Sequence, residues 1–242
     1  MNKGYFEIIR SGIHTTLQDL GRKNLYHIGI PFSGSMDRRN YLISNKLVGN
    51  ELNETSLEFA YQGPLIKINL GKVTGVITGN VTFNIIRKNS KIEKGICYQT
   101  FELNDGDQLD IISTNRSVYG YFSIKNGFVG EYIWGSYSVN TKAKIGSNKG
   151  EKFKINQKIF INKNESISGF KKINFLNTKI EYIRVLKGTN FNFFSENAKE
   201  IFFSKEFTVS KLTDRMGMRL EGPKIENLAE TNIRSEGLIK GV

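Results

Sequence analysis

The chain has 242 residues, 38% of them hydrophobic, and its 35 basic against 23 acidic side chains give a formal net charge of +12. A hydrophobic fraction of this size excludes an intrinsically disordered protein, and the length suits one large all-β domain or two small ones. Clustered positive charge would favour a nucleic-acid partner, but the lysines occur singly or in pairs throughout, so we expect no nucleic-acid interface.

Cysteine usage and hydropathy indicate the cellular compartment. The single cysteine, Cys97, excludes an intramolecular disulfide and a cysteine-based metal site, as is typical of a reducing compartment. We expect it to be a buried structural thiol in a strand, because apolar and polar residues alternate around it. Glu7 and Arg10 interrupt the N-terminal segment before it reaches the length of a signal peptide, and no later run approaches the ~20 apolar residues of a membrane span. We therefore expect a cytoplasmic protein that binds no membrane.

Short apolar or alternating runs predict strands along most of the chain, since Gly, Asn and Asp bound them at close intervals. These runs are YFEIIRSG at 5–12, LIKINLG at 65–71, VTGVITGN at 73–80, VTFNIIRKN at 81–89, QLDIISTN at 108–115 and VYGYFSIKNG at 118–127. The predicted class is therefore mainly β.

One or two short helices interrupt this pattern. In MDRRNYLISNKLVGN, at 36–50, the apolar residues follow helical spacing, Asp37 is placed to cap the N-terminus, and Gly49 is placed to end the helix. A second short helix or turn is predicted near FSENAKEIFF, at 194–203.

Chains with many strands usually close into sandwiches or barrels that hide the sheet edges. We expect two units, residues 1–115 and 116–242, because STNRS near residue 115 is typical of a connection. LEFAYQGPLIKI at 57–68 and RLEGPKIENL at 219–228 each place an acidic residue shortly before Gly-Pro. This similarity between the two segments supports two related units, although it is too short to establish an internal repeat.

Reactive side chains crowd the stretch at 12–22. His14, Gln18, Asp19 and Arg22 lie between residues that permit sharp turns. Histidine shuttles protons at neutral pH, aspartate orients it or acts as a base, and arginine binds carboxylate or phosphate in a bidentate manner. This set suits acyl or phosphoryl chemistry on a small anionic substrate. In the alternative interpretation, Asp19 pairs with Arg22 to fix a loop and His14 belongs to the core.

Two further segments contain candidate binding residues. The loop IPFSGSMD at 30–37 has the composition of a backbone-amide anion site before a helix, or of an ordinary loop capped by Asp37. Ser33 is a weaker candidate nucleophile because G-x-S-x-G is absent. In TDRMGMRLEGP at 213–223, Arg215 and Arg219 face one ligand or pair with neighbouring acids on a hairpin. The sequence contains no P-loop, no dinucleotide-binding G-x-G-x-x-G after a strand and no histidine pair at metal spacing, so we expect no metal.

Nine motifs occur in an order that resembles one known family. They are GIHTTLQDLGR (12–22), GIPFSGSMD (29–37), NKLVGN (45–50), LEFAYQGP (57–64), VTGVITGN (73–80), WGSYSVN (134–140), KIGSNKGEKFKINQKI (144–159), DRMGMRLEG (214–222) and RSEG (234–237). The series is similar to the biotin-dependent carboxyltransferase family, also called allophanate hydrolase subunit 2, which includes the C subunit of ATP-dependent 5-oxoprolinase. The resemblance extends over essentially the whole chain.

The resemblance implies a fold and a function. The fold would be two tandem cyclophilin-like β-barrels, 1–115 and 116–242. The family continues with further strands after S-E-G, so we expect the second barrel to be incomplete, with an exposed edge. The implied activity is hydrolysis of the 5-oxoproline lactam to glutamate, with ATP and with A and B subunits, ATP being bound by this chain or by a partner. The alternatives are a carboxyltransferase subunit that moves a carboxyl group from carboxybiotin to urea or a related amide, and an inactive binding or regulatory module.

The resemblance also assigns candidate site residues. His14 and Asp19 are the candidates for proton transfer, and Arg22 and Arg215 would hold a carboxylate or phosphate. The remaining pocket candidates are Gln18, Ser33, Asp37, Arg219 and Glu221.

Overall fold

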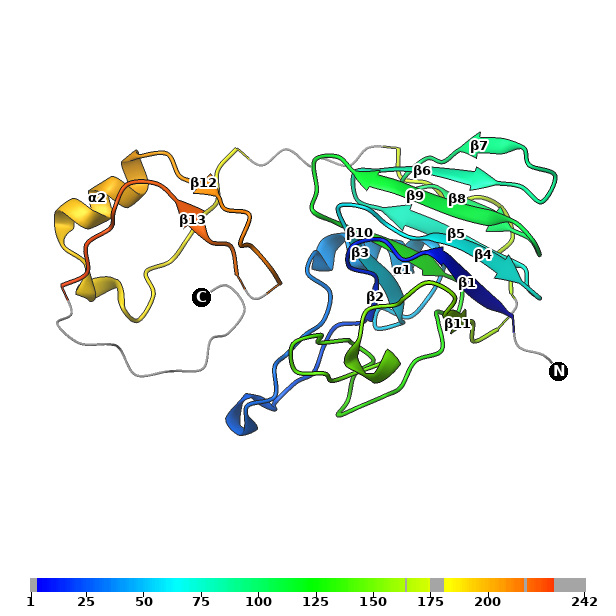
Figure 1. Cartoon of the computed structure of the whole chain (residues 1–242), viewed down its shortest axis with the longest axis horizontal. Coiled ribbons are helices and arrows are strands. Elements are labelled where there is room, and N and C mark those ends of the chain that lie inside the picture. Colours follow the sequence, from blue (N-terminus) through cyan, green and yellow to red (C-terminus); the bar gives the residue numbers. More distant parts are fainter. Residues whose placement is uncertain (1–3, 164, 175–180, 216, 229–242) are drawn as a thin grey trace. The chain divides into compact units, whose positions relative to one another are not determined.

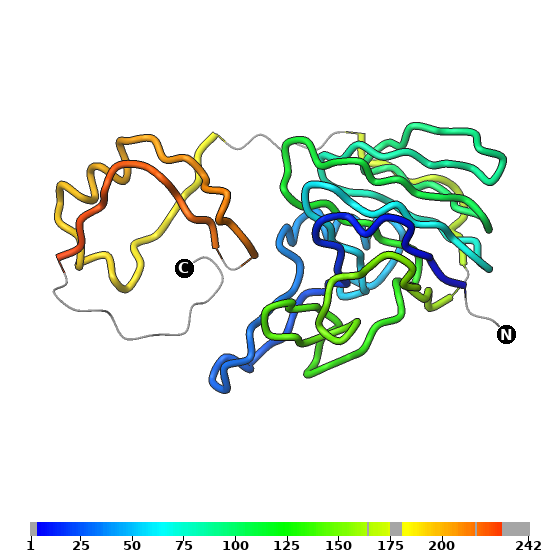
Figure 2. The backbone as a smooth tube through the Cα atoms, in the orientation of Figure 1, coloured from blue at the N-terminus to red at the C-terminus, as the bar shows by residue number. Residues whose placement is uncertain are grey.

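The computed structural model describes residues 4–163, 165–174, 181–215 and 217–228. The protein is mainly β, as predicted, and forms two compact units, Met1–Leu176 and Asn177–Val242 (Figures 1 and 2). In the described part of the chain, no helix is both long and apolar enough to cross a membrane.

The first unit contains two antiparallel sheets. The six-stranded sheet has the order β11-β1-β4-β9-β6-β7, and the five-stranded sheet has the order β2-β3-β10-β5-β8. The six strands are β1 (Tyr5–Arg10), β4 (Leu65–Asn69), β6 (Val81–Ile86), β7 (Ile92–Lys94), β9 (Gln108–Thr114) and β11 (Lys158–Phe160). The five are β2 (Thr16–Gln18), β3 (Ser56–Ala60), β5 (Val73–Thr78), β8 (Thr100–Leu103) and β10 (Tyr119–Ile124). The predicted strands at these positions are confirmed.

The hydrophobic core lies between the two sheets. Phe6 of β1 packs edge to face on Phe122 of β10, with ring centroids 5.6 Å apart, and Phe83 of β6 lies 5.5 Å from Phe101 of β8. All four side chains are buried, and each pair joins one sheet to the other. Face-to-face packing of this kind explains why alternate residues of both sheets are apolar. Closure into a cyclophilin-like barrel stays a prediction.

The helix α1 (Arg38–Leu47) packs against the five-stranded sheet. Its N-terminus is capped as predicted, because the Asp37 side chain accepts a hydrogen bond from the backbone amide of Asn40 at 3.0 Å. Gly49 follows the helix with a φ of 69°, a left-handed conformation that ends it as expected. Ser44 lies 2.6 Å from Ser123 of β10, oxygen to oxygen, and this contact fixes the helix to the sheet.

The boundary between the units differs from the expected position at residue 115. The strand β10 pairs with β3 and β5, and β11 pairs with β1, so the chain after residue 115 completes both sheets of the first unit. The first unit therefore extends to Leu176. Pairing partners about 60 and 155 residues upstream leave no local signal in the sequence, which explains the difference.

The cysteine environment also differs from expectation. Cys97 lies in a turn before β8 instead of in a strand, because Tyr98 adopts a left-handed φ of 58°. The thiol donates a hydrogen bond to the carbonyl oxygen of Val81 at 3.1 Å, and burial raises its pKa. A raised pKa lowers the thiolate fraction, so these features favour a structural thiol over a nucleophile.

The described part of the second unit contains short elements only. They are the 3-10 turn η3 (Phe191–Phe193), the helix α2 (Glu196–Ser204), and the strands β12 (Thr208–Val209) and β13 (Leu220–Glu221), which pair as a hairpin. The helix predicted near 194–203 is confirmed, and the Ser195 side chain caps it by accepting from the amide of Ala198 at 3.1 Å. The RSEG motif lies outside the described residues, and the incomplete barrel stays a prediction.

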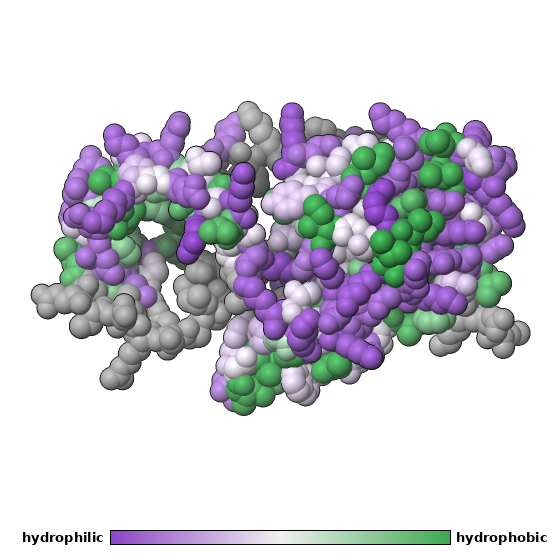
Figure 3. Space-filling model, viewed as in Figure 1, coloured by the Kyte–Doolittle hydropathy of each residue, from purple (hydrophilic) through white to green (hydrophobic). Residues whose placement is uncertain are grey.

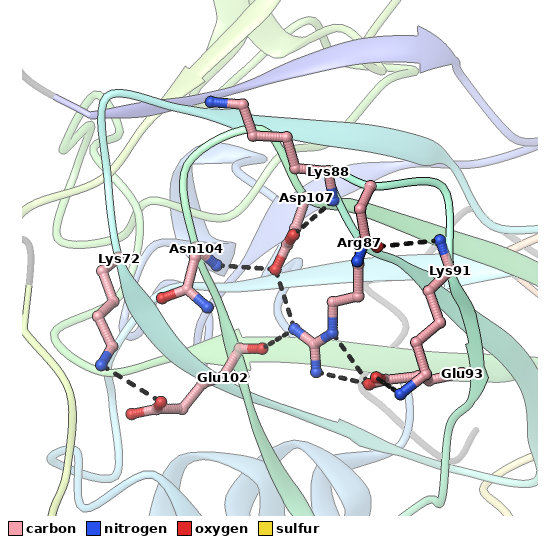
Figure 4. A network of polar contacts seen from close by, with 9 residues as sticks. Lys72, Arg87, Lys88, Lys91, Glu93, Glu102, Asn104 and Asp107 are labelled. Carbon is pink, nitrogen blue, oxygen red and sulfur yellow. Dashed lines mark hydrogen bonds and ion pairs between the residues drawn. The ribbon is translucent and has the colours of Figure 1, made fainter.

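A network of charged side chains connects the end of β6 with β7, β8 and the turn before β9 in the first unit (Figure 4). Arg87 donates to Asp107 at 2.9 Å, to the backbone carbonyl of Glu102 at 2.8 Å, and to Glu93 at 2.9 and 2.7 Å. Burial alone would lower the pKa of Arg87, but the hydrogen bonds to Glu93 and Asp107 raise it. The guanidinium therefore joins three separate segments.

Replacing Arg87 by methionine is expected to lower the free energy of unfolding by about 2–3 kcal/mol. The Asp107 side chain is only 5% exposed, so its carboxylate would lose the cation that compensates its burial. Urea denaturation provides the measurement. Lys88→Met is the matched control, because Lys88 is 73% exposed and contacts Asp105 at 3.6 Å, and it should change stability by less than about 0.5 kcal/mol. Equal effects of the two substitutions would contradict the assignment.

Candidate functional site

Asp19 joins two motifs that are more than 100 residues apart. One carboxylate oxygen accepts hydrogen bonds from the Gly21 amide at 2.8 Å, the Ser136 hydroxyl at 2.6 Å and the Ser138 hydroxyl at 2.5 Å. The other accepts from the Tyr137 amide at 2.8 Å. The side chain is fully buried, and both of its oxygens are engaged by serine and backbone donors of the protein itself. This geometry favours a positioning residue over a proton-transfer group.

A third motif, the loop at 30–37, packs against the same stretch. The Arg22 amide donates to the carbonyl oxygen of Phe32 at 2.8 Å, and the Ser35 amide donates to that of Asp19 at 2.9 Å. This close approach of the two backbone segments requires glycine at position 21. A Cβ atom there would lie 2.7 Å from the Phe32 carbonyl oxygen, and the φ of Gly21 is +88°. The tight turns expected at 12–22 therefore bring two backbone segments together.

The amides at the start of α1 already have protein acceptors. The Met36 amide donates to a Glu58 carboxylate oxygen at 2.9 Å, and the Asp37 amide donates to the Tyr121 hydroxyl at 2.7 Å. That hydroxyl in turn donates to the same Glu58 oxygen at 2.7 Å. Burial raises the pKa of Tyr121 well above its usual range, which keeps the hydroxyl a donor. Buried Glu58 thus supplies the anion that the sequence suggested for an external ligand, directly at the Met36 amide and through the Tyr121 hydroxyl at the Asp37 amide.

Arg22 has two side-chain donors without a hydrogen-bond partner in the described chain. Its side chain is 1% exposed, and Nε donates to the carbonyl oxygen of Ile133 at 3.2 Å. Both terminal nitrogens, Nη1 and Nη2, are buried without a hydrogen-bond partner among the described residues, and no ion pair with Asp19 forms. Burial lowers the pKa of Arg22, an effect that the nearby Asp19 charge opposes. A planar fork of unpaired donors in a buried position is suited to bind a carboxylate or a phosphate.

Gln18 offers an unpaired acceptor in the same motif. Its side-chain nitrogen donates to the Thr16 hydroxyl and to the Val139 carbonyl oxygen, both at 3.0 Å. The side-chain oxygen is buried and has no partner in the described chain. This oxygen would accept a hydrogen bond from an amide N–H of a ligand. His14 is half-buried just before β2, and its role in proton transfer stays a prediction.

Two other predicted pocket residues have contacts within the protein. The Asp37 carboxylate caps α1 and also accepts from the Asn40 side chain at 2.5 Å. Ser33 is half-buried, with a left-handed φ of 58°, and its hydroxyl lies 3.5 Å from the carbonyl oxygen of Pro31. Both residues shape the loop, and their contact with a substrate stays a prediction.

The late cluster lies in the second unit, on the β12–β13 hairpin. The Glu221 carboxylate accepts from the Ser210 hydroxyl at 2.5 Å, and the Ser210 amide donates to the carbonyl oxygen of Arg219 at 2.8 Å. Arg215 lies in the connecting loop. The segment forms a hairpin, and pairing of Arg215 and Arg219 with neighbouring acids stays a prediction. Participation of Arg215, Arg219 and Glu221 in the Arg22 site stays a prediction.

The sequence interpretation missed the residues that hold the site together. Glu58, Tyr121, Ser136 and Ser138 were not among the candidates, although Glu58 and the two serines lie inside the motifs that carry the family resemblance. One signal was available for Glu58. A carboxylate between two apolar residues in a strand that is buried throughout requires a partner inside the protein.

Comparisons with known proteins agree on one family. The profile of the carboxyltransferase domain, subdomain A and B, matches residues 28–242. The chain is 26% identical over 244 aligned residues to the C subunit of 5-oxoprolinase from Escherichia coli, covering 98% of this chain and 74% of that protein. It is 28% identical to urea amidolyase of Saccharomyces cerevisiae, covering 90% of this chain but only 12% of that protein.

Solved structures show the same fold. The Kluyveromyces lactis urea amidolyase superposes with a TM-score of 0.78 and 24% identity, covering 95% of this chain and 15% of that one. The urea carboxylase of Kluyveromyces lactis gives the same TM-score, identity and coverage of this chain, with 21% of its own chain covered. At this identity the likeness concerns the fold alone.

Proposed function

The chain belongs to the family of the carboxyltransferase domain, subdomain A and B, and on that premise we propose that it is the C subunit of an ATP-dependent 5-oxoprolinase. It would act in the cytoplasm with partners resembling the A and B subunits of that enzyme and hydrolyse the 5-oxoproline lactam to glutamate. The similarity to the C subunit of the Escherichia coli 5-oxoprolinase over 98% of this chain supports the proposal.

The unpaired Arg22 guanidinium is the observation that favours this substrate. 5-Oxoproline has a carboxylate beside its lactam ring, and this carboxylate would bind the two terminal nitrogens of Arg22. The lactam N–H lies on the neighbouring ring atom and is the kind of donor that the unpaired Gln18 oxygen lacks. Neutral urea supplies N–H donors but leaves the buried positive charge without a counterion.

The chemistry assigns different tasks to the residues of the site. A lactam amide is a poor electrophile, and transfer of a phosphoryl group from ATP to its oxygen activates the ring carbon for attack by water. The ring C–N bond then breaks and the nitrogen takes up a proton, for which His14 is the candidate donor. Water then hydrolyses the resulting acyl phosphate to the carboxylate of glutamate and free phosphate. Arg22 would hold and orient the substrate, whereas Asp19 would maintain the loops around it. The unpaired nitrogens of Arg22 would equally fit a phosphate, so ATP binding by this chain or by a partner is compatible with the site.

One observation favours a second candidate function. The identity to urea amidolyase is 28%, close to the 26% for the 5-oxoprolinase relative. In a carboxyltransferase acting on urea or a related amide, the carboxylate of carboxybiotin would be the anion at Arg22. Biotin would then be a substrate carrier.

The deciding experiment measures phosphate release from ATP by this chain combined with its A-like and B-like partners. We expect 5-oxoproline to stimulate release at least 10-fold, with glutamate formed in equal amount to phosphate. Omission of this chain is the control. Stimulation by urea and bicarbonate in the presence of a biotin carboxylase, but not by 5-oxoproline, would overturn the proposal in favour of the carboxyltransferase.

A further inference from the structure

The Arg22 side chain is closed off from solvent and contacts one short turn. It is 1% exposed, and Nη1 and Nη2 are buried without a hydrogen-bond partner among the described residues. Nε donates to the carbonyl oxygen of Ile133, the first residue of a four-residue turn that ends at Ser136. We call these four residues the 133–136 turn. A ligand reaches the two terminal nitrogens only after part of the protein moves.

The backbone around Arg22 itself is packed too closely to move. The Arg22 amide donates to the carbonyl oxygen of Phe32, and a Cβ atom at Gly34 would lie 3.0 Å from the Gly21 nitrogen. These two segments are therefore held against each other, backbone to backbone. At the tip of the 133–136 turn, in contrast, a Cβ atom on Gly135 would have no atom within 4 Å. The turn is the neighbour of Arg22 that has room to move.

The 133–136 turn has a strained backbone. Its ends exchange backbone hydrogen bonds, from the Ile133 amide at 2.9 Å and from the Ser136 amide at 3.3 Å. Both central residues are left-handed, with φ of 51° at Trp134 and 81° at Gly135. Such turns favour Asn-Gly, and a bulky side chain in left-handed backbone carries a steric cost. Strain of this kind is often stored where a protein has to move, and opening of the turn would relieve it.

Fixed contacts on both sides confine any movement to this turn. Before it, the Glu131 amide donates to the Ser147 hydroxyl at 3.1 Å, and after it the Ser136 hydroxyl donates to Asp19 at 2.6 Å. Trp134 is 56% exposed, so opening would sacrifice little buried surface. The chain between β10 and β11 forms loops at this end of the first unit (Figure 1), where hydrophobic side chains reach the surface (Figure 3).

We infer that the 133–136 turn is a gate that opens to admit a small anion to Arg22 and closes again over it; the inference rests on the anion-binding role of Arg22 proposed above. Opening breaks the hydrogen bond from Arg22 Nε to Ile133 and relieves the left-handed backbone at Trp134. Closing restores both around the bound carboxylate or phosphate and separates it from bulk water. Because the anion enters only the open form, the rate of binding depends on how often the turn opens.

The test uses the fluorescence of Trp134, the only tryptophan in the chain. Inorganic phosphate and 5-oxoproline are each mixed with the purified full-length chain in a stopped-flow instrument. We expect a saturable change in fluorescence whose rate levels off at high anion concentration, because opening of the turn then limits binding. Arg22→Met should abolish the change, since it removes the two nitrogens that hold the anion.

A pair of matched variants tests the turn itself. Gly135→Ala strains the closed turn through its φ of +81° without a steric clash, so the limiting rate and the hydrogen exchange of the Ile133 amide should both rise about 5-fold or more. Gly29→Ala is the control, because Gly29 follows the 3-10 turn η1 (Tyr26–Ile28) with a φ of +77° and equally free space. It should keep the wild-type rates. Both variants should melt within about 3 °C of wild type, since each strains one exposed residue.

The outcomes separate the gate from the proposed function. Equal rates in the two glycine variants, binding that leaves the fluorescence of Trp134 unchanged, or no binding of either anion by the wild-type chain overturns the gate. Gated binding of phosphate without binding of 5-oxoproline supports the gate and contradicts the proposed substrate. Phosphate release stimulated by 5-oxoproline in the reconstituted complex, together with a binding rate that rises linearly with concentration, supports the function and contradicts the gate.

Discussion

Replacing Arg22 by methionine is expected to lower 5-oxoproline-stimulated phosphate release about 100-fold or more, while the melting temperature stays the same or rises. The activity falls because a charge-assisted contact to the substrate is worth about 1.5–3 kcal/mol, and Arg22 offers two. The stability does not fall because, among the described residues, the buried guanidinium has a hydrogen-bond partner only at Nε, which donates to Ile133. Hydrophobic replacement of a buried charge is often neutral or stabilising.

A conservative variant separates charge from geometry at this position. Arg22→Lys retains the positive charge but lacks the planar fork, so it should keep a small part of the activity and raise KM. Activity assays of the reconstituted complex and calorimetric melting of the isolated chain provide the two measurements. A parallel loss of activity and stability in Arg22→Met would contradict a substrate-binding role and indicate a structural one.

Replacing Asp19 by alanine is expected to lower the free energy of unfolding by about 3–5 kcal/mol. The amides of Gly21 and Tyr137 would be left buried without an acceptor, at about 1–3 kcal/mol each, and the two serine hydroxyls would lose theirs. For a unit of this size the melting temperature would fall by roughly 10 °C. Activity should decline in parallel, because the loops that hold Arg22 lose their shared anchor.

Two variants complete this measurement. Asp19→Asn keeps one acceptor oxygen but turns an amide group toward serine and backbone donors, so its stability should lie between wild type and Asp19→Ala. Glu131→Ala removes an exposed carboxylate from the neighbouring loop and should change stability by less than about 0.5 kcal/mol. A stable Asp19→Asn enzyme with strongly lowered but measurable activity and a displaced pH profile would instead establish Asp19 as a proton-transfer group.

Asp19 and Arg22 have different roles in the site. Asp19 accepts four hydrogen bonds and is satisfied by the fold alone. Arg22, three residues later, has two buried nitrogens without a partner in the part of the chain that the structure describes, which lowers stability. Sites that bind ligands often retain such a deficit, because the ligand supplies the missing partner.

The sequence alone predicted the features that depend on local interactions. Alternating apolar residues identified most of the long strands, since the period of two places every second side chain in the core. Asp37 and Gly49 marked the ends of α1 because capping and left-handed termination involve only neighbouring residues. The motif order also identified the family, and the glycines at 12–37 predicted the tight turns found there.

Only the tertiary structure decided which of the clustered side chains have hydrogen-bond partners among the described residues and which have none. The acceptors and donors that distinguish Asp19 from Arg22 come from residues 133–138, more than 100 positions away, and the acceptor for Met36 is Glu58 on β3. The unit boundary at Leu176 likewise follows from β10 and β11 pairing with strands far upstream. Residue types determine which chemistry a segment can perform. Long-range packing determines which of these side chains are hydrogen-bonded within the protein and which stay available to a ligand, and no local sequence pattern encodes that packing.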